Sequence, residues 1–230
     1  MAGSHLGLKI FLIPLLTFFW VGCESRSGTS GAPAPLTPQV KPPQTVSASE
    51  AEPKIPSFTP FIVYKDKGSR NRFVPSGFMP NGECLTLDDA WIQNCYDGKT
   101  CIKIVYDIAC SQESRKWAGI YWLNPPDNWG QRKGGYDLTG ATRLTFWAKG
   151  EKGGERIEEF KIGGVGTTMD YPDSDMAMIG PVILTDQWRQ YTIDLRGKDL
   201  SFISGGFAWV SNVDVNPESC TFYLDEIHYE

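Results

Sequence analysis

Short apolar segments separated by glycine-containing turns fill the sequence after residue 60, and this pattern limits the fold to β structure. Pairs such as Asp97-Gly98, Gly153-Gly154 and Gly205-Gly206 stand between the segments, where turns with a positive φ favour glycine. No long stretch shows the 3.6-residue apolar period of an amphipathic helix. Regularly spaced short strands predict an all-β domain over residues 61–230, an antiparallel β-sandwich or barrel.

The expected strands are short, and turn residues bound each of them. They are Phe61–Tyr64, Cys84–Leu87, Cys101–Tyr106, Trp117–Leu123, Arg143–Lys149, Ile157–Ile162, Pro181–Leu184, Trp188–Leu195, Gly206–Val210 and Thr221–Tyr229. A segment of this total length is enough for one domain with a substantial core.

The strand expected at 117–123 is unusually rich in aromatic residues. With a period of two, Ala118, Ile120 and Trp122 lie on one face of the strand. Trp117 and Tyr121 lie on the other face, which has no obvious reason to be buried if the first face is core. The alternative is that all these rings pack in the core or against structural loops, since such rings normally bury a large area.

Two further expected strands repeat this division into a core face and a mixed polar and aromatic face. In 143–149, the alternation leaves Trp147 and Lys149 opposite the apolar set, and in 157–162 it leaves Glu159 and Lys161 outside. If these strands are neighbours, their outward faces form a ligand platform. A solvated sheet face explains Glu159 and Lys161 equally well, but it explains Trp147 poorly.

An exposed aromatic surface beside charged hydrogen-bonding groups suits a sugar ring, which offers an apolar C–H face and a rim of hydroxyls. We therefore expect non-catalytic glycan binding. The alternative is a protein-interaction or assembly module that uses the same aromatic face. The expected carbohydrate-binding residues are Trp117, Tyr121, Trp147, Lys149, Glu159 and Lys161, with Trp129, on the loop after 124–128, and Trp209 as second candidates.

Three segments in order along the chain resemble the galactose-binding-like jelly-roll domains used as carbohydrate-binding modules. The segments are Tyr136–Gly150, Trp188–Leu195 and Thr221–Ile227, and the resemblance extends over most of residues 61–230. It implies a jelly-roll sandwich and a polysaccharide or oligosaccharide ligand.

The same resemblance implies a structural calcium ion, because family members often hold one with a carboxylate on the last strand. Asp225 would be that ligand, together with Asp88 or Asp89 near the N-terminal edge. Calcium binds several oxygen ligands. The segment 173–175 is a second candidate, although a polar loop is the simpler interpretation there.

The N-terminus predicts export. An apolar run at 10–21 follows Lys9, and its length is typical of a signal peptide and too short for a membrane span. The sequence Trp20-Val21-Gly22-Cys23 resembles the cleavage box of bacterial lipoproteins, although Trp20 replaces the usual leucine. This predicts a signal peptide at 1–22 and lipidation of Cys23, and an ordinary signal peptide cut nearby is the alternative.

Residues 23–60 contain many Pro, Ser and Thr residues and almost no large apolar side chains, which predicts a disordered tether. The lipid would be the only contact with the membrane. Glu24 follows Cys23 in place of the aspartate that commonly retains such lipoproteins at the inner membrane. We therefore expect the outer membrane or cell surface as the location, and the periplasm otherwise.

The cysteines fit an oxidising compartment. With Cys23 lipidated, Cys84, Cys95, Cys101, Cys110 and Cys220 remain, so at least one of them is free or pairs elsewhere. Of these, Cys95 and Cys101 flank an Asp-Gly turn and could close across a hairpin, although the sequence does not fix the pairing.

Several kinds of chemistry are disfavoured. The chain has two histidines, His5 and His228, and His5 leaves with the signal peptide, which excludes a multi-histidine zinc site. A net charge of −5 argues against a nucleic-acid partner. A glycoside hydrolase needs only a pair of carboxylates and is the third alternative. The acidic residues that could supply this pair are Glu155, Glu158, Glu159, Asp170, Asp173 and Asp175.

Overall fold

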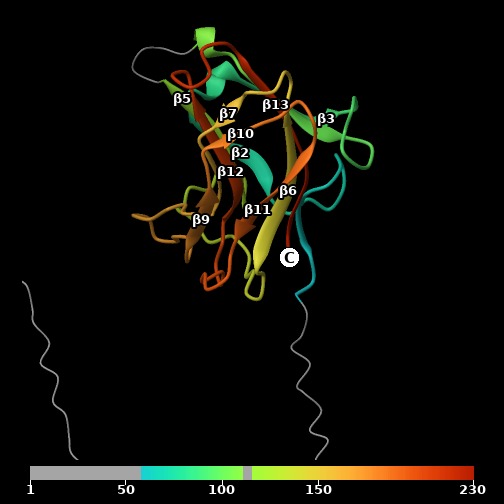
Figure 1. The fold of residues 1–230 in the computed structure, drawn as a ribbon. Helices are drawn as coiled ribbons and strands as arrows, with labels where there is room; N and C mark the ends of the chain where they lie inside the picture. The colour runs from blue at the N-terminus through green and yellow to red at the C-terminus, as the bar shows by residue number, and fades with distance from the viewer. Residues whose placement is uncertain (1–57, 111–115) are drawn as a thin grey trace, which may run out of the picture. The chain divides into compact units, whose positions relative to one another are not determined.

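Two antiparallel sheets packed face to face form the domain (Figure 1). The computed structural model describes residues 58–110 and 116–230, so the expected signal peptide, Cys23 and nearly all of the tether lie outside the described residues. Within this part of the chain, no helix has the length and apolar character needed to cross a membrane. The fold class predicted from the sequence is confirmed.

The first sheet, called sheet A below, has the strand order β11-β6-β13-β4-β3, with β1 also paired to β13. Its strands are β1 (Phe61–Tyr64), β3 (Leu85–Trp91), β4 (Cys101–Tyr106), β6 (Arg143–Gly150), β11 (Arg189–Asp194) and β13 (Cys220–Tyr229). The central strand β13 pairs with β6 on one side. On its other side it pairs first with β4 and then with β1.

The second sheet, called sheet B below, has the order β2-β5-β12-β8-β9. Its strands are β2 (Val74–Pro80), β5 (Trp117–Leu123), β8 (Glu159–Gly163), β9 (Met176–Ile179) and β12 (Gly205–Asn212). A two-stranded sheet of β7 (Arg156–Ile157) and β10 (Val182–Ile183) and two 3-10 helices, η1 (Gly82–Cys84) and η2 (Ile108–Cys110), complete the described elements.

Alternate residues of both sheets meet in one core. Phe146 of sheet A packs its ring 4.7 Å from that of Phe160 and 5.1 Å from that of Phe207, both in sheet B. Trp209 of sheet B likewise packs edge to face against Phe222 of sheet A, with ring centroids 4.9 Å apart. Each such fully buried side chain contributes about 2 kcal/mol to folding. The residues between them in sequence therefore lie on the two outer faces of the sandwich.

Most of the predicted strands are present. The bounds of β1, β4 and β5 agree with prediction residue by residue, whereas the single strand expected over 157–162 is divided into β7 and β8. Two edge strands, β2 and β9, were not predicted. β2 contains Pro75 and Pro80. A proline has no N–H to donate to the hydrogen-bond ladder, and an edge strand tolerates this because it has a partner strand on one side only.

Candidate functional site: a groove on the outer face of sheet A

A row of polar and aromatic side chains crosses the outer face of sheet A. Tyr223 of β13 is opposite Lys149 of β6 on one side and Lys103 of β4 on the other. Trp188 immediately precedes β11, whose first residue pairs with the residue before Lys149. Lys103, Lys149 and Tyr223 point outward because their neighbours in sequence fill the core.

The loop 92–100, which joins β3 to β4, reaches across this face. At its start, the indole N–H of Trp91 donates to the Gln93 carbonyl at 2.9 Å. Farther along, the Asn94 carbonyl accepts the indole N–H of Trp188, at the opposite edge of the sheet, at 2.8 Å. The rings of Trp91 and Trp188 lie 6.2 and 6.5 Å from that of Tyr223. The loop thus forms one wall of a groove, and Tyr223 is its floor.

Two contacts hold the middle of the loop in place. Tyr96 stacks on Trp147 of β6, with ring centroids 3.6 Å apart and planes inclined by 14°. Its ring also lies 6.3 Å from that of Trp188. A disulfide between Cys95 and Cys101 closes the loop where it meets β4. Tyr96 remains 42% exposed, so the stacked pair forms part of the surface.

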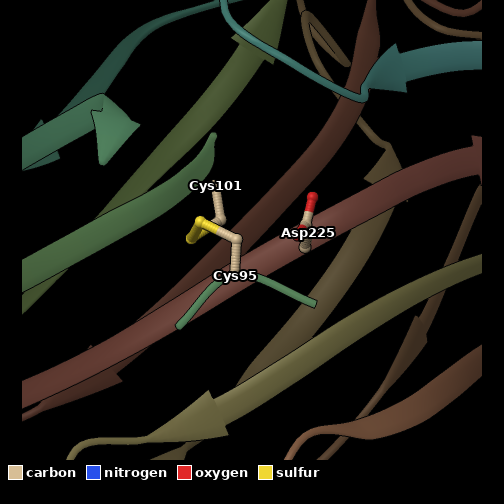
Figure 2. Close-up of side chains that lie close together, drawn as sticks. All are labelled: Cys95, Cys101 and Asp225. Carbon is tan, nitrogen blue, oxygen red and sulfur yellow. A yellow bond between two sulfur atoms is a disulfide. The ribbon is translucent and has the colours of Figure 1, made fainter. Parts of the chain in front are cut away.

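Asp225 fixes the loop from below. It pairs with Trp147 of β6 on one side, but on the other side it lies where β13 changes partner from β4 to β1, and no strand is paired with it there. Its Oδ2 instead accepts the backbone N–H groups of Tyr96 at 3.0 Å and Asp97 at 3.1 Å. Figure 2 shows Asp225 beside the Cys95–Cys101 disulfide. The carboxylate thus takes the place of a missing strand neighbour.

Burial of Asp225 raises its pKa from 3.8 to about 6, despite the N–H donors that favour the charged form. The native state therefore keeps the proton to a higher pH than the unfolded chain. The protonated Asp225 therefore contributes to the free energy of unfolding fully below about pH 4, and this contribution is lost as the pH rises through about 6.

We expect Asp225→Asn to remove this pH dependence. Relative to the variant, the wild type should lose up to about 3 kcal/mol of unfolding free energy between about pH 4 and 7. Urea unfolding of both proteins at the two pH values measures this difference, in which the contributions of the other carboxylates cancel. Parallel changes in the two proteins would contradict the assignment.

The groove consists of two adjoining hollows that share Asn94 and Lys149. One, of about 210 Å³, is lined by Trp91, Tyr223, Lys103 and Glu151 among others. The other, of about 400 Å³, is bounded by Trp188, Gln187 and Asp186. The hydroxyl of Tyr223 donates to the Glu151 carboxylate. Another hollow, of about 220 Å³ around residues 152–155 and 215–219, has no aromatic side chain among its lining residues.

The predicted platform does not exist as a single surface. Trp147 and Lys149 belong to sheet A, whereas Trp117, Tyr121, Glu159 and Lys161 belong to sheet B. Because both sets alternate with core residues, they lie on opposite outer faces of the sandwich. The condition on which the platform depended, that these strands are neighbours, is not met: β5 and β8 both pair with β12, and β6 pairs with β11 and β13.

Tyr121 and Trp129 form a second, smaller core on the outer side of sheet B. Tyr121 is only 5% exposed, and its hydroxyl donates to the Gly163 carbonyl at 3.0 Å. The half-buried Trp129 packs edge to face against it, and Val165 belongs to the same cluster. Loops thus cover the face that the alternation left open, and the expectation that Tyr121 is an exposed stacking surface is wrong.

The other residues expected to bind glycan on sheet B are also arranged differently. Lys161 pairs with Glu159 at 3.0 Å, and its ammonium lies 5.4 Å from the centroid of the Tyr121 ring. Trp117 remains 41% exposed at the start of β5. Trp209 is fully buried between the sheets, so its prediction as a ligand-contacting residue is wrong.

The three carboxylates proposed for calcium do not fit that ion. Asp225 directs its oxygens at backbone N–H groups, whereas calcium needs free oxygen ligands. Asp89 is paired with Lys67 at 2.6 Å, and Asp88 accepts the N–H of Ala90. The one cluster of potential ligand residues in the described part of the chain joins Asp225 to Cys95 and Cys101, whose sulfur atoms are bonded to each other.

The carboxylates considered for glycoside hydrolysis mostly have structural partners. Ion pairs join Glu158 to Arg156, Glu159 to Lys161 and Asp175 to Lys198. Asp173 accepts N–H groups of Val165, Ser204 and Gly205; its burial raises its pKa although these donors oppose the shift. Glu155 accepts the N–H of Lys152, and Asp170 is exposed. None of these residues lines the groove on sheet A.

No protein-family model and no curated protein sequence matches the chain. Among solved structures, it is similar to a family 30 carbohydrate-binding module, with a TM-score of 0.49 and 16% identity over 75% of this chain and 98% of the other. The family 30 module of a cellulosomal cellulase from Clostridium thermocellum has a TM-score of 0.48, 16% identity and coverages of 75% and 97%. A family 11 module of that organism, in complex with a mixed-linked tetrasaccharide, has a TM-score of 0.38, 12% identity and coverages of 63% and 80%.

Much of the groove was missed at the level of sequence. Lys103 and Tyr223 follow from the same alternation that identified Trp147, because Ile102, Ile104 and Phe222 are apolar neighbours in predicted strands. In contrast, Trp91 and Trp188 stand at strand ends, where alternation gives no direction. Their role depends on the loop 92–100, whose path no local pattern predicts.

Proposed function

We propose that the groove on sheet A binds a segment of a glycan chain without cleaving it. The observation that carries this proposal is that the half-buried rings of Trp91 and Trp188 line a shallow groove together with ammonium, amide and carboxylate groups, on either side of Tyr223, which is only 4% exposed and supports them. Sugar rings need this combination, because each presents C–H groups to an aromatic face and hydroxyls to polar side chains.

The groove is held in shape before a ligand arrives. Both indole N–H groups are bonded to the carbonyls of the loop, and Asp225 and a disulfide hold the loop itself. Affinity for a flexible, polar ligand depends strongly on such preorganisation, because little further ordering of the protein is needed on binding.

We expect Trp188→Ala to weaken glycan binding by about tenfold or more, because it removes one aromatic wall. Affinity gel electrophoresis with a panel of soluble polysaccharides measures the effect. Trp117→Ala is the control, since it removes an exposed tryptophan from sheet B, on the opposite face of the sandwich, and should leave the retardation unchanged.

The proposal is supported if a polysaccharide retards the wild type and Trp117→Ala but does not retard Trp188→Ala. Equal retardation of the three proteins would place binding elsewhere. If no polysaccharide retards the wild type, the protein-interaction alternative is favoured. Release of reducing sugars from a retained glycan would favour the hydrolase, for which Glu151 and Asp186 are the carboxylates that line the groove.

We also propose that the domain acts outside the cytoplasm as the tethered part of a lipoprotein. The support for this is the sequence of residues 10–23 and the composition of residues 23–60. Two disulfides in the described domain agree with an oxidising compartment.

A further inference from the structure

We infer that the groove selects glycans that carry carboxylate groups, a refinement that rests on the function proposed above. The inference comes from Lys103 and Lys149. They flank Tyr223 in one row across β4, β13 and β6, so that both ammonium groups project into the floor of the groove.

Both lysines lie against aromatic rings. The ammonium of Lys103 lies 4.1 Å from the Trp91 ring centroid and 5.7 Å from that of Tyr223. The ammonium of Lys149 lies 4.8 Å from the Tyr223 centroid and 5.7 Å from that of Trp188. Such cation–π contacts restrict the position of a lysine, but they leave its N–H donors without strong acceptors.

Two carboxylates, those of Glu151 and Asp186, also line the groove, but neither pairs with these lysines. In the described part of the chain, neither Lys103 nor Lys149 forms an ion pair with a carboxylate. Glu151 accepts the hydroxyl of Tyr223, and Asp88, the cross-strand neighbour of Lys103, accepts the N–H of Ala90. Asp186 lines the far hollow, beside Trp188.

A carboxylate in this groove would therefore gain charge-assisted hydrogen bonds from ammonium groups that no described carboxylate already engages. Such bonds are roughly twice as strong as those that a neutral hydroxyl would make. The lysines stand two strands apart, about 10 Å between backbones, and their ammonium groups lie 5.7 and 4.8 Å from the Tyr223 ring centroid, so a chain with repeated carboxylates can engage both. A glycan rich in uronic acid has this chemistry.

The test compares polygalacturonate with the same polymer after complete methyl esterification, which removes charge but keeps the backbone. We expect the wild type to bind the acid form about tenfold more tightly than the ester. Lys103→Met and Lys149→Met, which keep the apolar stem, should each lose about tenfold in affinity for the acid and change little for the ester. Lys152→Met is the matched control, because Lys152 is an exposed lysine outside the groove.

Each outcome separates this inference from the proposed function. If the acid and ester forms of the polymer bind equally, or if only neutral polysaccharides bind, the inferred selectivity is overturned. The proposed glycan binding stands in both cases. If Lys152→Met weakens binding to the acid form as much as Lys103→Met does, the attraction is a general effect of charge and the inference is also overturned. The same holds if dextran sulfate binds as tightly as the acid form. If no polysaccharide of any kind binds, both the inference and the proposed function fail.

Discussion

A variant with Cys95 and Cys101 both replaced by serine is expected to remain folded but to bind glycan at least about tenfold more weakly. The disulfide closes the loop that carries Asn94 and Tyr96, and these residues hold Trp188 and cover Trp147. Without the crosslink, the loop must be ordered by the ligand, and this ordering cost is subtracted from the binding free energy.

The second disulfide provides a matched control, because it lies at the other end of the same hairpin. Cys84 and Cys110 join η1 to η2 and are separated by 26 residues, compared with 6 for Cys95 and Cys101. In the chain-entropy account, the longer closure contributes about 4 kcal/mol to stability and the shorter about 2 kcal/mol.

The two variants should therefore show opposite rankings. Replacing Cys84 and Cys110 should lower the free energy of unfolding more, yet preserve glycan affinity in the folded protein. Replacing Cys95 and Cys101 should lower stability less, yet impair binding. Urea unfolding and affinity electrophoresis on the same samples give both quantities. If binding follows stability in the two variants, the loop has no special role in the groove.

The sequence was informative about which way a side chain points and uninformative about which sheet its strand joins. The alternation in 117–123 and 143–149 correctly separated core residues from the others, because a pleated strand has a strict period of two. Whether Trp147 and Trp117 share a surface depends on pairings between distant segments, and each of these strands could have joined either sheet without altering its own pattern. The predicted direction of the side chains was therefore right within each of these strands, but the prediction that they form one shared surface was wrong.

Tyr121 shows a second limit. It lies on the face of β5 that alternation leaves open, but a central strand can be buried on both sides. Trp209, by contrast, lies on the core face of β12 with Phe207, so its burial follows from the alternation itself. β12 lies between β5 and β8 in sheet B, and loop residues such as Val165 cover its outer side. A nearly continuous run of small and apolar residues in 205–209 was the available evidence, since doubly covered strands lose their alternation.

The burial of Trp209 leads to the largest stability change that we expect from a single substitution. Its indole is fully buried and packs edge to face on Phe222. Trp209→Ala should lower the free energy of unfolding by about 4 kcal/mol, because it removes apolar contacts from both sheets and leaves a cavity. Trp117→Ala, on an exposed strand end, should change it by less than about 1 kcal/mol.

Trp209→Phe separates packing from hydrogen bonding at this position. Among the described residues, the indole N–H of Trp209 has no acceptor, and a buried donor without a partner costs about 1–3 kcal/mol. Phenylalanine removes this donor while keeping most of the ring, so the loss of stability should be about 1 kcal/mol. Urea unfolding of the three variants measures the series. A loss for Trp209→Phe as large as that for Trp209→Ala would mean that the N–H is satisfied in the folded protein, and a loss for Trp117→Ala as large as that for Trp209→Ala would contradict the assignment of Trp209 to the core.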